Sequence, residues 1–446
     1  MLQNHSPQQI KTLKMNKPHV VIIGSGISGL SACWHLRNHA RITLIEKGNY
    51  LGGHTHTHGL HVDEKVVHVD SGFIVFNDKT YPGLIDWFST LNIASHPADM
   101  SFSVSLGNGE FEWSGSNLKT IFAQKQRIYD AAFLKMLLDI LRFNRNAPKD
   151  VARYQSTKKA SISLGEYLDE ERYNAYFQNR YLLPMAGAIW SCSTSEIRKF
   201  PLKFLVSFCE NHGLLSVLNR PQWFSVKGGS ESYINAMLKV TADLPISIKK
   251  NTRALSVKKT PIGLKITTLE ADQTHKNIDC DHVLLASHAD ESAQILKTMG
   301  HAMTSVLSRI KFQSNTAVMH MDSSLMPKLS TAWSSWNYLS HDSLDANPRI
   351  GVTYFMNKLQ DLPTRKNLFV TLNPTKQIDP SKIFKSIEYS HPVMNQDREI
   401  AVRNIHRFQG ENNVWVAGAW MGNGFHESGF QSGRHVAEKI IENYTR

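Results

Sequence analysis

The sequence predicts an α/β fold in which one domain is built on a parallel sheet and a second, discontinuous domain combines a mixed sheet with helices. Three observations predict it. A β-branched run at 19–23 leads into the glycine-rich turn GSGISG at 24–29, and residues of helical composition follow. A second apolar run at 42–45 ends in Glu46. Further short apolar runs at 283–286 and 414–417 have the composition of strands in a sheet that is buried on both faces.

The first of these segments has the order of a Rossmann-like βαβ dinucleotide unit. Gly24 permits the tight turn, Gly26 lets the backbone approach a pyrophosphate, and Gly29 lets the helix pack close to the strand. Glu46 follows Gly26 by 20 residues, where a carboxylate can bind a ribose hydroxyl. A glycine turn between two core elements is the alternative. The predicted nucleotide contacts in this unit are Gly24, Ser25, Gly26, Ile27, Ser28, Gly29, Glu46 and Lys47.

The later elements suggest a second domain. Residues 75–225 are expected to be mostly a helical insertion, with one helix over 117–144. Strands are predicted at 246–248, 254–257, 264–266, 317–321, 350–355 and 368–372, and a final helix at 432–444.

Composition limits the classes of partner and compartment. The 446 residues contain 50 Lys and Arg against 38 Asp and Glu, a net charge of +12 that favours an anionic partner. The charge is diffuse and no nucleic-acid-binding module is present, so we expect no nucleic-acid binding. Four widely spaced cysteines predict neither a disulfide framework nor a zinc site. A polar start without an apolar core, and no run long enough to span a bilayer, favour the cytoplasm.

Four further motifs identify the nucleotide by resemblance. LGGHT at 51–55, VDSG at 69–72, AGAW at 417–420 and GFHESGFQSG at 424–433 resemble those of the FAD-dependent amine oxidase and phytoene desaturase superfamily. The resemblance implies non-covalently bound FAD, held between the two ends of the chain. It adds these predicted cofactor contacts: Gly52, Gly53, His54, Thr55, Gly72, Ala254, Gly418, Ala419, Gly424, Phe425, His426 and Gly429.

The composition of the segments, together with this resemblance, predicts a division into domains. A flexible tail would occupy 1–15, with Met15 as an alternative start. The FAD-binding domain would comprise 16–75, 225–300 and 405–446. The substrate-binding domain with its helical insertion would comprise 76–224 and 301–404.

A closer resemblance is to bacterial predicted FAD-binding oxidoreductases encoded beside methyltransferases similar to cyclopropane fatty acid synthase. GGHTHTH, DSGFIVFN, DMSFSVS, RPQW, VTLNP and GFHESG carry it. It implies an apolar, fatty acyl or lipid-like substrate that is oxidised or desaturated by hydride transfer to flavin N5. The sequence departs from amine oxidases, which usually have arginine where His54 stands, a lysine in the segment that matches 313–318, and an acid at Ala419. Phe425 takes the place of one wall of their aromatic cage.

The reacting end of the site is less well defined by the sequence. Phe425, His426 and His212 are candidate catalytic residues, and Trp190, Trp223, Trp336 and Tyr354 are candidate substrate contacts. Any single one of these aromatic residues is more commonly part of a core than a substrate contact. His54, His56 and His58 would share one face of an extended strand, with His61 nearby, and could contact flavin, bind a metal or form a polar loop. No metal site is predicted.

The sequence is compatible with two roles for its basic segment and with three functions. The basic residues at 117–159 could form a solvated helix face or contact an anionic membrane surface. The function could be that of a lipid oxidoreductase, of a flavin-containing amine oxidase, or of a flavin-dependent isomerase or redox or light sensor. No second dinucleotide motif is present, so reoxidation is expected from oxygen, a quinone or a carrier protein.

Overall fold

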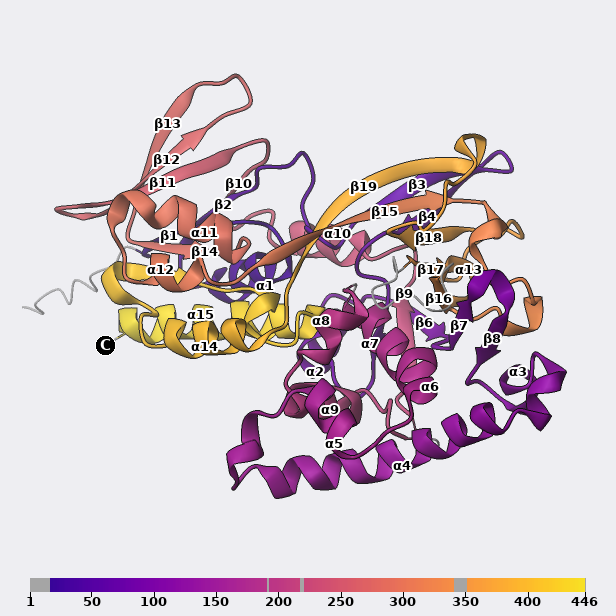
Figure 1. Ribbon diagram of the computed structural model, residues 1–446. Coiled ribbons are helices and arrows are strands. Elements are labelled where there is room, and N and C mark those ends of the chain that lie inside the picture. The colour runs from indigo at the N-terminus through magenta and orange to yellow at the C-terminus, as the bar shows by residue number, and fades with distance from the viewer. Residues whose placement is uncertain (1–16, 191, 217–219, 341–350, 446) are drawn as a thin grey trace, which may run out of the picture.

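The computed structural model describes residues 17–190, 192–216, 220–340 and 351–445. The predicted tail at 1–15, with Met15, lies outside the described residues. Figure 1 shows two lobes: one with α1, α11 and α15 around a parallel sheet, and one in which a wide sheet lies above a group of helices. The predicted α/β class is confirmed.

The first lobe is centred on a five-stranded parallel sheet of order β10-β2-β1-β14-β20. The strands are β1 (His19–Ile23), β2 (Arg41–Ile45), β10 (Ile246–Lys249), β14 (His282–Leu285) and β20 (Val414–Val416). β1, β14 and β20 are buried along their whole length, which explains their largely apolar sequences. Strand order reverses at β1, and ligands of such sheets bind at the carboxyl ends of the strands beside this point.

Helices cover both faces of this sheet. Val20 and Ile22 of β1 pack with α1, α2, α10 and α15, whereas Val21 and Ile23 pack with α11, α12 and α14. The helices are α1 (Ile27–Leu36), α2 (Pro82–Thr90), α10 (Glu231–Val240), α11 (Ala289–Leu296), α12 (Met303–Leu307), α14 (Gln396–Ile405) and α15 (His426–Thr445). An antiparallel sheet of β11 (Arg253–Thr260), β12 (Gly263–Leu269) and β13 (His275–Cys280) projects from this lobe.

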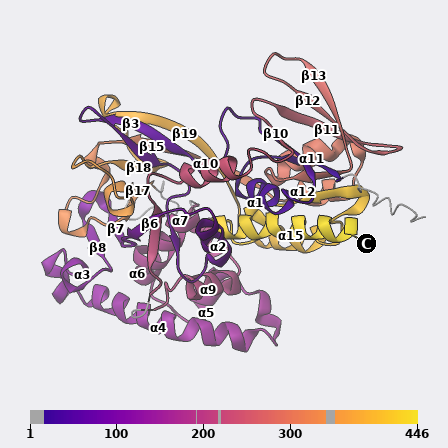
Figure 2. The same ribbon diagram turned by 180° about the vertical axis from the view of Figure 1, so that it is seen from behind.

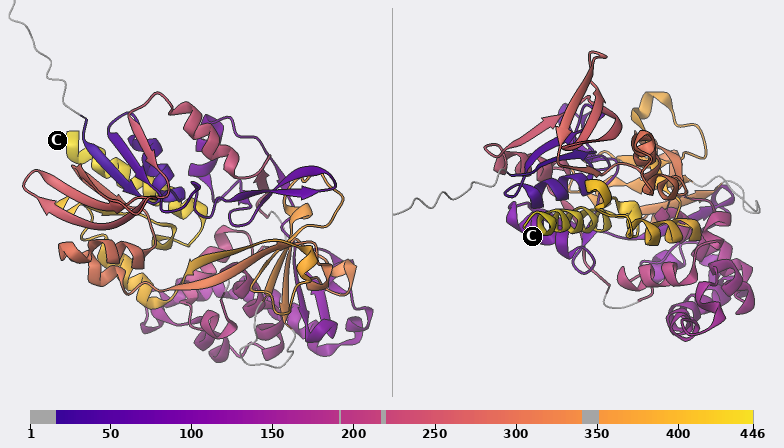
Figure 3. Two further views of the ribbon diagram at one scale, coloured as in Figure 1. Left: turned by 90° about the horizontal axis from the view of Figure 1, so that it is seen from above. Right: turned by 90° about the vertical axis from the view of Figure 1, so that its left-hand side faces the viewer.

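The second lobe contains a seven-stranded mixed sheet of order β19-β15-β18-β17-β16-β7-β8. Its strands are β7 (Phe102–Leu106), β8 (Phe111–Ser114), β15 (Phe312–His320), β16 (Trp336–Ser340), β17 (Gly351–Phe355), β18 (Phe369–Leu372) and β19 (Ile383–Pro392). Seen from above, β15 and β19 run from the first lobe into the second (Figure 3). Two smaller sheets and a short helix complete the lobe: β3 (Thr57–Val62) with β4 (Lys65–Asp70), β5 (Phe76–Asn77) and β6 (Ser95–Ala98) with β9 (Trp223–Val226), and α13 (Met356–Leu359).

The helical insertion is shorter than the predicted range 75–225. Residues 95–114 contribute strands β6, β7 and β8, and the helices occupy 118–211. They are α3 (Leu118–Ile121), α4 (Ala131–Tyr154), α5 (Leu164–Glu170), α6 (Ala175–Phe177), α7 (Leu183–Trp190), α8 (Thr194–Arg198) and α9 (Leu202–Asn211). The single helix expected over 117–144 is interrupted because Asp130 accepts the N–H groups of Ala132 and Phe133 and so starts α4 at residue 131.

Packing crosses the predicted domain boundaries in two places. Met303 of α12 and Ala401 of α14 lie in the same core as Val21, although both helices fall within the predicted substrate domain. Leu60 and Val67 of the β3–β4 hairpin pack against the seven-stranded sheet instead, although the hairpin falls within the predicted FAD-binding domain. No helix among the described residues combines the length and apolarity needed to cross a membrane.

Candidate functional site

The two ends of the chain meet where α1 crosses α15. A Cβ atom at Gly433 would lie 2.0 Å from the carbonyl oxygen of Ser28, and one at Gly429 would lie 2.6 Å from Cγ2 of Ile27. The hydroxyl of Ser31 donates to the carbonyl of Phe430 at 2.7 Å. Only glycine allows the helices to approach this closely, so the glycines of the C-terminal motif place its segment beside the N-terminal turn.

The glycine turn after β1 leaves room for a ligand at one position. Gly24 has φ of +104°, and a Cβ there would lie 2.6 Å from the carbonyl oxygen of Ala286. Gly26 differs, because a Cβ at this residue would have no atom within 4 Å. Gly26 is also the N-cap of α1, where free N–H groups and the helix dipole attract anions. This opening fits the pyrophosphate of a dinucleotide.

Glu46 lies at the end of β2 and faces the same turn. Its carboxylate accepts hydrogen bonds from the N–H and the hydroxyl of Ser25, at 3.0 and 2.6 Å, and from the N–H of Gly48 at 2.8 Å. These contacts fix the carboxylate at the edge of the cavity, at the place where a ribose hydroxyl would be bound. Lys47 forms an ion pair with Glu291 at the same rim.

A continuous cavity of about 1000 Å³ begins at this turn and reaches the second lobe. Most predicted cofactor contacts line it: Gly24, Ser25, Gly26, Ile27, Ser28, Glu46, Lys47, Gly52, Gly53, His54, Gly72, Ala254, Gly418, Ala419, Gly424, Phe425 and His426. Three do not. Gly29 and Gly429 lie in the close packing of α1, and the hydroxyl of Thr55 is engaged by Tyr233 and His426.

His54 carries an unused polar atom at this cavity. Its ring stacks on Tyr389 with centroids 4.7 Å apart, and its Nε2 is buried without a hydrogen-bond partner. Burial, together with the neighbouring His391 and His288, lowers the pKa of His54 well below 6.5, so the ring is neutral. A buried polar atom without a partner costs free energy, which a ligand that pairs with it would recover.

His391, at the end of β19, also lines the cavity, and the hydrogen-bond network assigns its tautomer. Asn373 Oδ1 accepts the N–H of Thr316, so its Nδ2 donates to Asn315 Oδ1. Asn315 Nδ2 therefore donates to Nδ1 of His391 at 2.9 Å. Nε2 of His391 must then carry the proton of a ring whose pKa burial lowers to about 4.

The sequence interpretation missed His391, Tyr389 and His288 as cavity residues. His288 follows the carboxyl end of β14, where the switch-point rule for parallel sheets could have identified it. No local signal marks Tyr389 or His391, because β19 reaches the cavity only through its pairing with β15.

The two candidate catalytic histidines are held in buried networks. Nε2 of His426 lies 3.0 Å from the hydroxyls of both Thr55 and Tyr233, and burial lowers its pKa to about 3. His212 lies outside the cavity lining, where its Nδ1 is 2.9 Å from the Phe208 carbonyl and burial lowers its pKa to about 4. Both rings are neutral near pH 7 and are weak bases, which argues against an acid–base role.

The aromatic candidates separate by position. Trp190 and Phe425 line the cavity, with ring centroids 6.4 Å apart. Trp223 lies outside the lining and stacks on His212. Trp336 and Tyr354 pack edge to face at 4.8 Å in the core of the second lobe. The structure therefore leaves Trp190 as the substrate-contact candidate within the cavity.

The histidine-rich segment is occupied by local contacts. The rings of His56 and His58 are 3.9 Å apart, which places both on one side of the chain, facing β19. His61 is exposed. Within the part of the chain that the structure describes, no three His, Cys, Asp or Glu side chains are grouped as metal ligands would be. The four cysteines are free and buried, and none lines the cavity.

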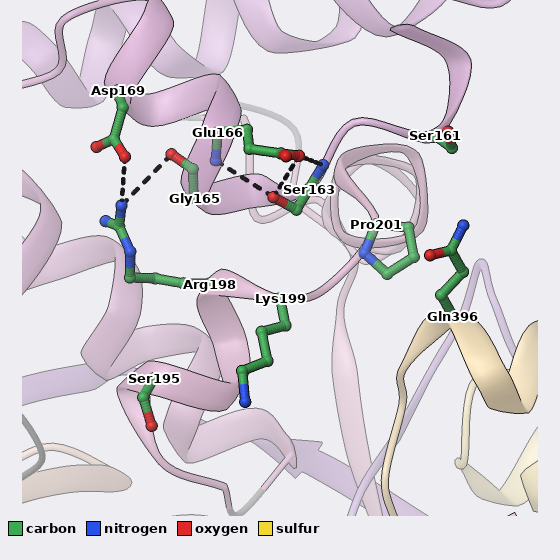
Figure 4. A pocket seen from close by; sticks show the side chains of 10 residues that line it. All are labelled: Ser161, Ser163, Gly165, Glu166, Asp169, Ser195, Arg198, Lys199, Pro201 and Gln396. Carbon is green, nitrogen blue, oxygen red and sulfur yellow. Dashed lines mark hydrogen bonds and ion pairs between the residues drawn. The ribbon is translucent and has the colours of Figure 1, made fainter.

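A second, shallower pocket lies between α5, α8 and the start of α14 (Figure 4). Its charged groups already have partners within the protein. Arg198 binds Asp169 and the Gly165 carbonyl, and Glu166 caps α5 through Ser163. We assign no ligand to it.

A comparison with protein families supports the assignment of a dinucleotide-binding unit in the first lobe. Residues 22–91 match the family described as NAD(P)-binding Rossmann-like domain, which covers the glycine turn, Glu46 and the LGGHT segment. A search of curated protein sequences returned no match.

Solved structures extend the likeness to the whole chain. A candidate protoporphyrinogen oxidase from Exiguobacterium sp. 255-15 is 15% identical with a TM-score of 0.66, over 96% of this chain and 100% of that one. Cyclohexylamine oxidase from Brevibacterium oxydans IH-35A is 13% identical with a TM-score of 0.65, over 96% and 100%. A fatty acid isomerase from P. acnes that produces CLA is 12% identical with a TM-score of 0.63, over 95% and 98%. The predicted superfamily resemblance is therefore confirmed in the fold: this chain contains a Rossmann dinucleotide unit within the architecture shared by these amine oxidase, protoporphyrinogen oxidase and fatty acid isomerase structures.

Proposed function

We propose that the protein is an FAD-dependent oxidoreductase of the amine oxidase and phytoene desaturase superfamily that oxidises or desaturates an apolar, fatty acyl or lipid-like substrate. The observation that carries the substrate class is the apolar inner end of the cavity. Ile189 and Trp190 of α7, Pro392 at the end of β19, Met394 after it, and Phe425 before α15 form this end. None of these side chains is charged. The ring of the buried Phe208 packs behind Trp190, with centroids 4.6 Å apart.

The residues around the cavity fit non-covalent FAD. The opening at Gly26 and the N-terminus of α1 would hold the pyrophosphate, and Glu46 the ribose. His54 Nε2 would gain a partner on the cofactor. FAD would supply a hydride acceptor at N5 for the reacting carbon of the substrate. An external oxidant, such as oxygen, a quinone or a carrier protein, would take up the two electrons.

The chain itself would orient the substrate by burying it. Each methylene group moved from water into an apolar site contributes about 0.8 kcal/mol. Ten methylenes along Ile189, Trp190 and Phe425 would contribute roughly 8 kcal/mol before ordering costs. This binding energy, remote from the reacting carbon, can position a chain that has few other features. The same apolar walls exclude water from the reacting end.

Two alternatives keep specific support. Cyclohexylamine oxidase shares the fold, which favours a flavin-containing amine oxidase as the second candidate. Its difficulty is that an ammonium group would lose water among the apolar side chains without a carboxylate to replace it. The fatty acid isomerase shares the fold as well and favours a third candidate, an isomerase acting on the same substrate class.

One assay separates the three. The FAD-loaded protein is mixed without oxygen with a total lipid extract, and in parallel with polyamines and aromatic amines, while flavin absorbance and products are followed. Bleaching by lipids, with a product two hydrogens lighter by mass spectrometry, supports the proposal. Bleaching by amines alone identifies an amine oxidase, and a rearranged lipid of unchanged mass identifies an isomerase.

A variant connects the outcome to the cavity. Ile189→Glu introduces a charge at the apolar end without touching the phosphate end of the site. We expect bound FAD to remain and turnover of lipids to fall at least tenfold. Unchanged turnover of lipids by this variant would show that the substrate lies elsewhere.

A further inference from the structure

The outer face of the helical insertion carries an unusual share of exposed apolar side chains. Twelve large apolar residues are exposed in the part of the chain that the structure describes, and six of them lie within 118–141. Three of the six, Leu134, Leu138 and Leu141, lie on α4 and make up what we call the α4 face; the others are Leu118 in α3 and Ile128 and Tyr129 in the turn before α4. Figures 1 and 2 both show α4 as the outermost element on its side of the molecule.

The leucines of α4 form a stripe that the fold does not bury. Leu134, Leu138 and Leu141 follow each other at intervals of four and three residues, which aligns them along one side of a helix. Their exposed fractions are 39%, 67% and 54%. The opposite side of α4, with Phe133 and Met136, is fully buried in the core of the insertion. The helix therefore has two apolar sides, and only the inner one is covered.

Unpaired positive charge lies on the same helix. Lys135, Arg145 and Lys149 of α4 are exposed and have no acidic partner within 4 Å among the described residues. The three acids between residues 118 and 154 already have partners, since Asp130 pairs with Arg127, Asp139 with Arg142 and Asp150 with Arg153. The α4 face thus combines apolar side chains that can enter a membrane interface with lysines that can reach lipid phosphates.

We propose that the α4 face docks on the surface of an anionic lipid bilayer, with the leucines among the outer acyl carbons and the basic residues on the headgroups. A second copy of this chain fits less well, because two such faces would bring their unpaired lysines together. An anionic surface complements the same charges. The docking is peripheral, since α4 carries too many charges to cross a bilayer.

The position of the α4 face fits a lipid substrate without depending on one. Phe133 and Met136 on the inner side of α4 belong to the same apolar core as Trp190, and Phe425 packs against that core. The proposed membrane-binding helix and the wall of the cavity are therefore packed into one core. Docking would hold the cavity at a fixed height above the lipid surface.

The test is sedimentation of the full FAD-loaded protein with vesicles of phosphatidylcholine alone or of equal parts phosphatidylcholine and phosphatidylglycerol. We expect binding to the anionic vesicles that weakens with salt, and little binding to the neutral ones. The triple variant Leu134→Ser, Leu138→Ser, Leu141→Ser should bind at least tenfold more weakly. As a control, Ile262→Ser removes an apolar residue that is even more exposed, at 89%, from the β11–β12 turn and should bind as the natural protein does.

A second variant keeps the proposal testable if the triple leucine variant fails to fold. Lys135→Glu with Lys149→Glu changes only exposed charges and should also lose binding to anionic vesicles. Natural protein that stays in the supernatant with anionic vesicles, or variants that bind like it, would overturn the proposal. So would a dimer by light scattering that the leucine variant dissociates, because the α4 face would then bind a second copy. None of these outcomes depends on turnover, so they are separate from the test of the proposed function.

Discussion

Substitution of Gly26 should weaken FAD binding and leave stability nearly unchanged, whereas substitution of Gly29 should lower stability. This contrast tests the placement of the cofactor. Gly26 has φ of −63° and ψ of 174°, which any residue adopts, and its Cβ would enter open space. Gly29 lies within α1, and its Cβ would lie 2.0 Å from the carbonyl oxygen of Gly24. A side chain at Gly26 therefore fills the predicted pyrophosphate site, whereas one at Gly29 separates α1 from β1.

The expected magnitudes follow from these distances. Gly26→Val should change the free energy of unfolding of the FAD-free protein by less than about 1 kcal/mol, since the backbone is already compatible. It should displace one or two charge-assisted hydrogen bonds to phosphate, which amounts to about 3 kcal/mol, or roughly 100-fold in the dissociation constant for FAD. Gly29→Ala should destabilise the same FAD-free protein by about 1–3 kcal/mol or more, because backbone atoms must move apart.

The assay measures two quantities on each variant. Urea unfolding of the FAD-free protein gives stability, and quenching of flavin fluorescence gives the dissociation constant. An unchanged affinity for FAD in Gly26→Val would contradict this placement of the cofactor, because the space at Gly26 would then not be the pyrophosphate site. Equal loss of stability in both variants would also refute it, because Gly26 would then be needed for packing.

Three further predictions concern the cavity wall and its supports. His54→Phe keeps the stack on Tyr389 but removes the buried Nε2, so we expect unchanged or higher stability without FAD and about tenfold weaker FAD binding; equal FAD affinity would show that Nε2 does not meet the cofactor. Burial holds the folded-state pKa values of His212 and His426 at about 4 and about 3, below their ordinary 6.5, so the unfolded chain binds more protons under acid conditions. The free energy of unfolding should then fall by up to about 1.4 kcal/mol per pH unit for each ring as the pH drops from about 6.5 towards 4, and urea midpoints that stay flat between these values would contradict this. Glu427 accepts hydrogen bonds from the N–H groups of Gly83 and Leu84, in the first turn of α2, at 2.9 and 3.0 Å. Glu427→Ala should therefore lower the free energy of unfolding in urea by about 1–2 kcal/mol, and a change below the error of the measurement would exclude a role of Glu427 in capping α2.

The first lobe could be predicted from sequence because its signals are local. The strand, turn, helix and acid at 19–46 are consecutive, and each residue type answers a requirement of its own position. The C-terminal strand was predicted for the same reason, since the run at 414–416 is apolar and buried on both faces. The second lobe is different, because β19 has mostly polar, half-exposed residues and is defined by its pairing with β15. No alternation of apolar and polar residues within 383–392 predicts that pairing.

The site divides in the same way. Most of the predicted cofactor contacts in the glycine motifs line the cavity, because glycine at a turn or a close approach has a mechanical cause that is visible in sequence. Aromatic candidates were harder to rank. Trp190 and Trp336 look alike in sequence, and only the fold places one at the cavity and the other in a core. Asp130 was a different kind of error. The helical pattern over 117–144 concealed the N-cap at Asp130, where α4 begins.

The histidines at the cavity bear on the choice of substrate. His54 stands where the resemblance to amine oxidases predicts arginine. The 313–318 segment contains no lysine and contributes Asn315, which donates a hydrogen bond to His391. Burial lowers the pKa of His54, His288 and His391, so at neutral pH these rings present dipoles and no charge. A cationic substrate would lose its water here without gaining an ion pair, whereas an acyl chain has no charge to desolvate. His54→Arg returns charge to the wall, so we expect turnover of lipids to fall by a larger factor than FAD affinity, because a guanidinium can pair with the cofactor's phosphates. Equal losses in lipid turnover and in FAD affinity would contradict this.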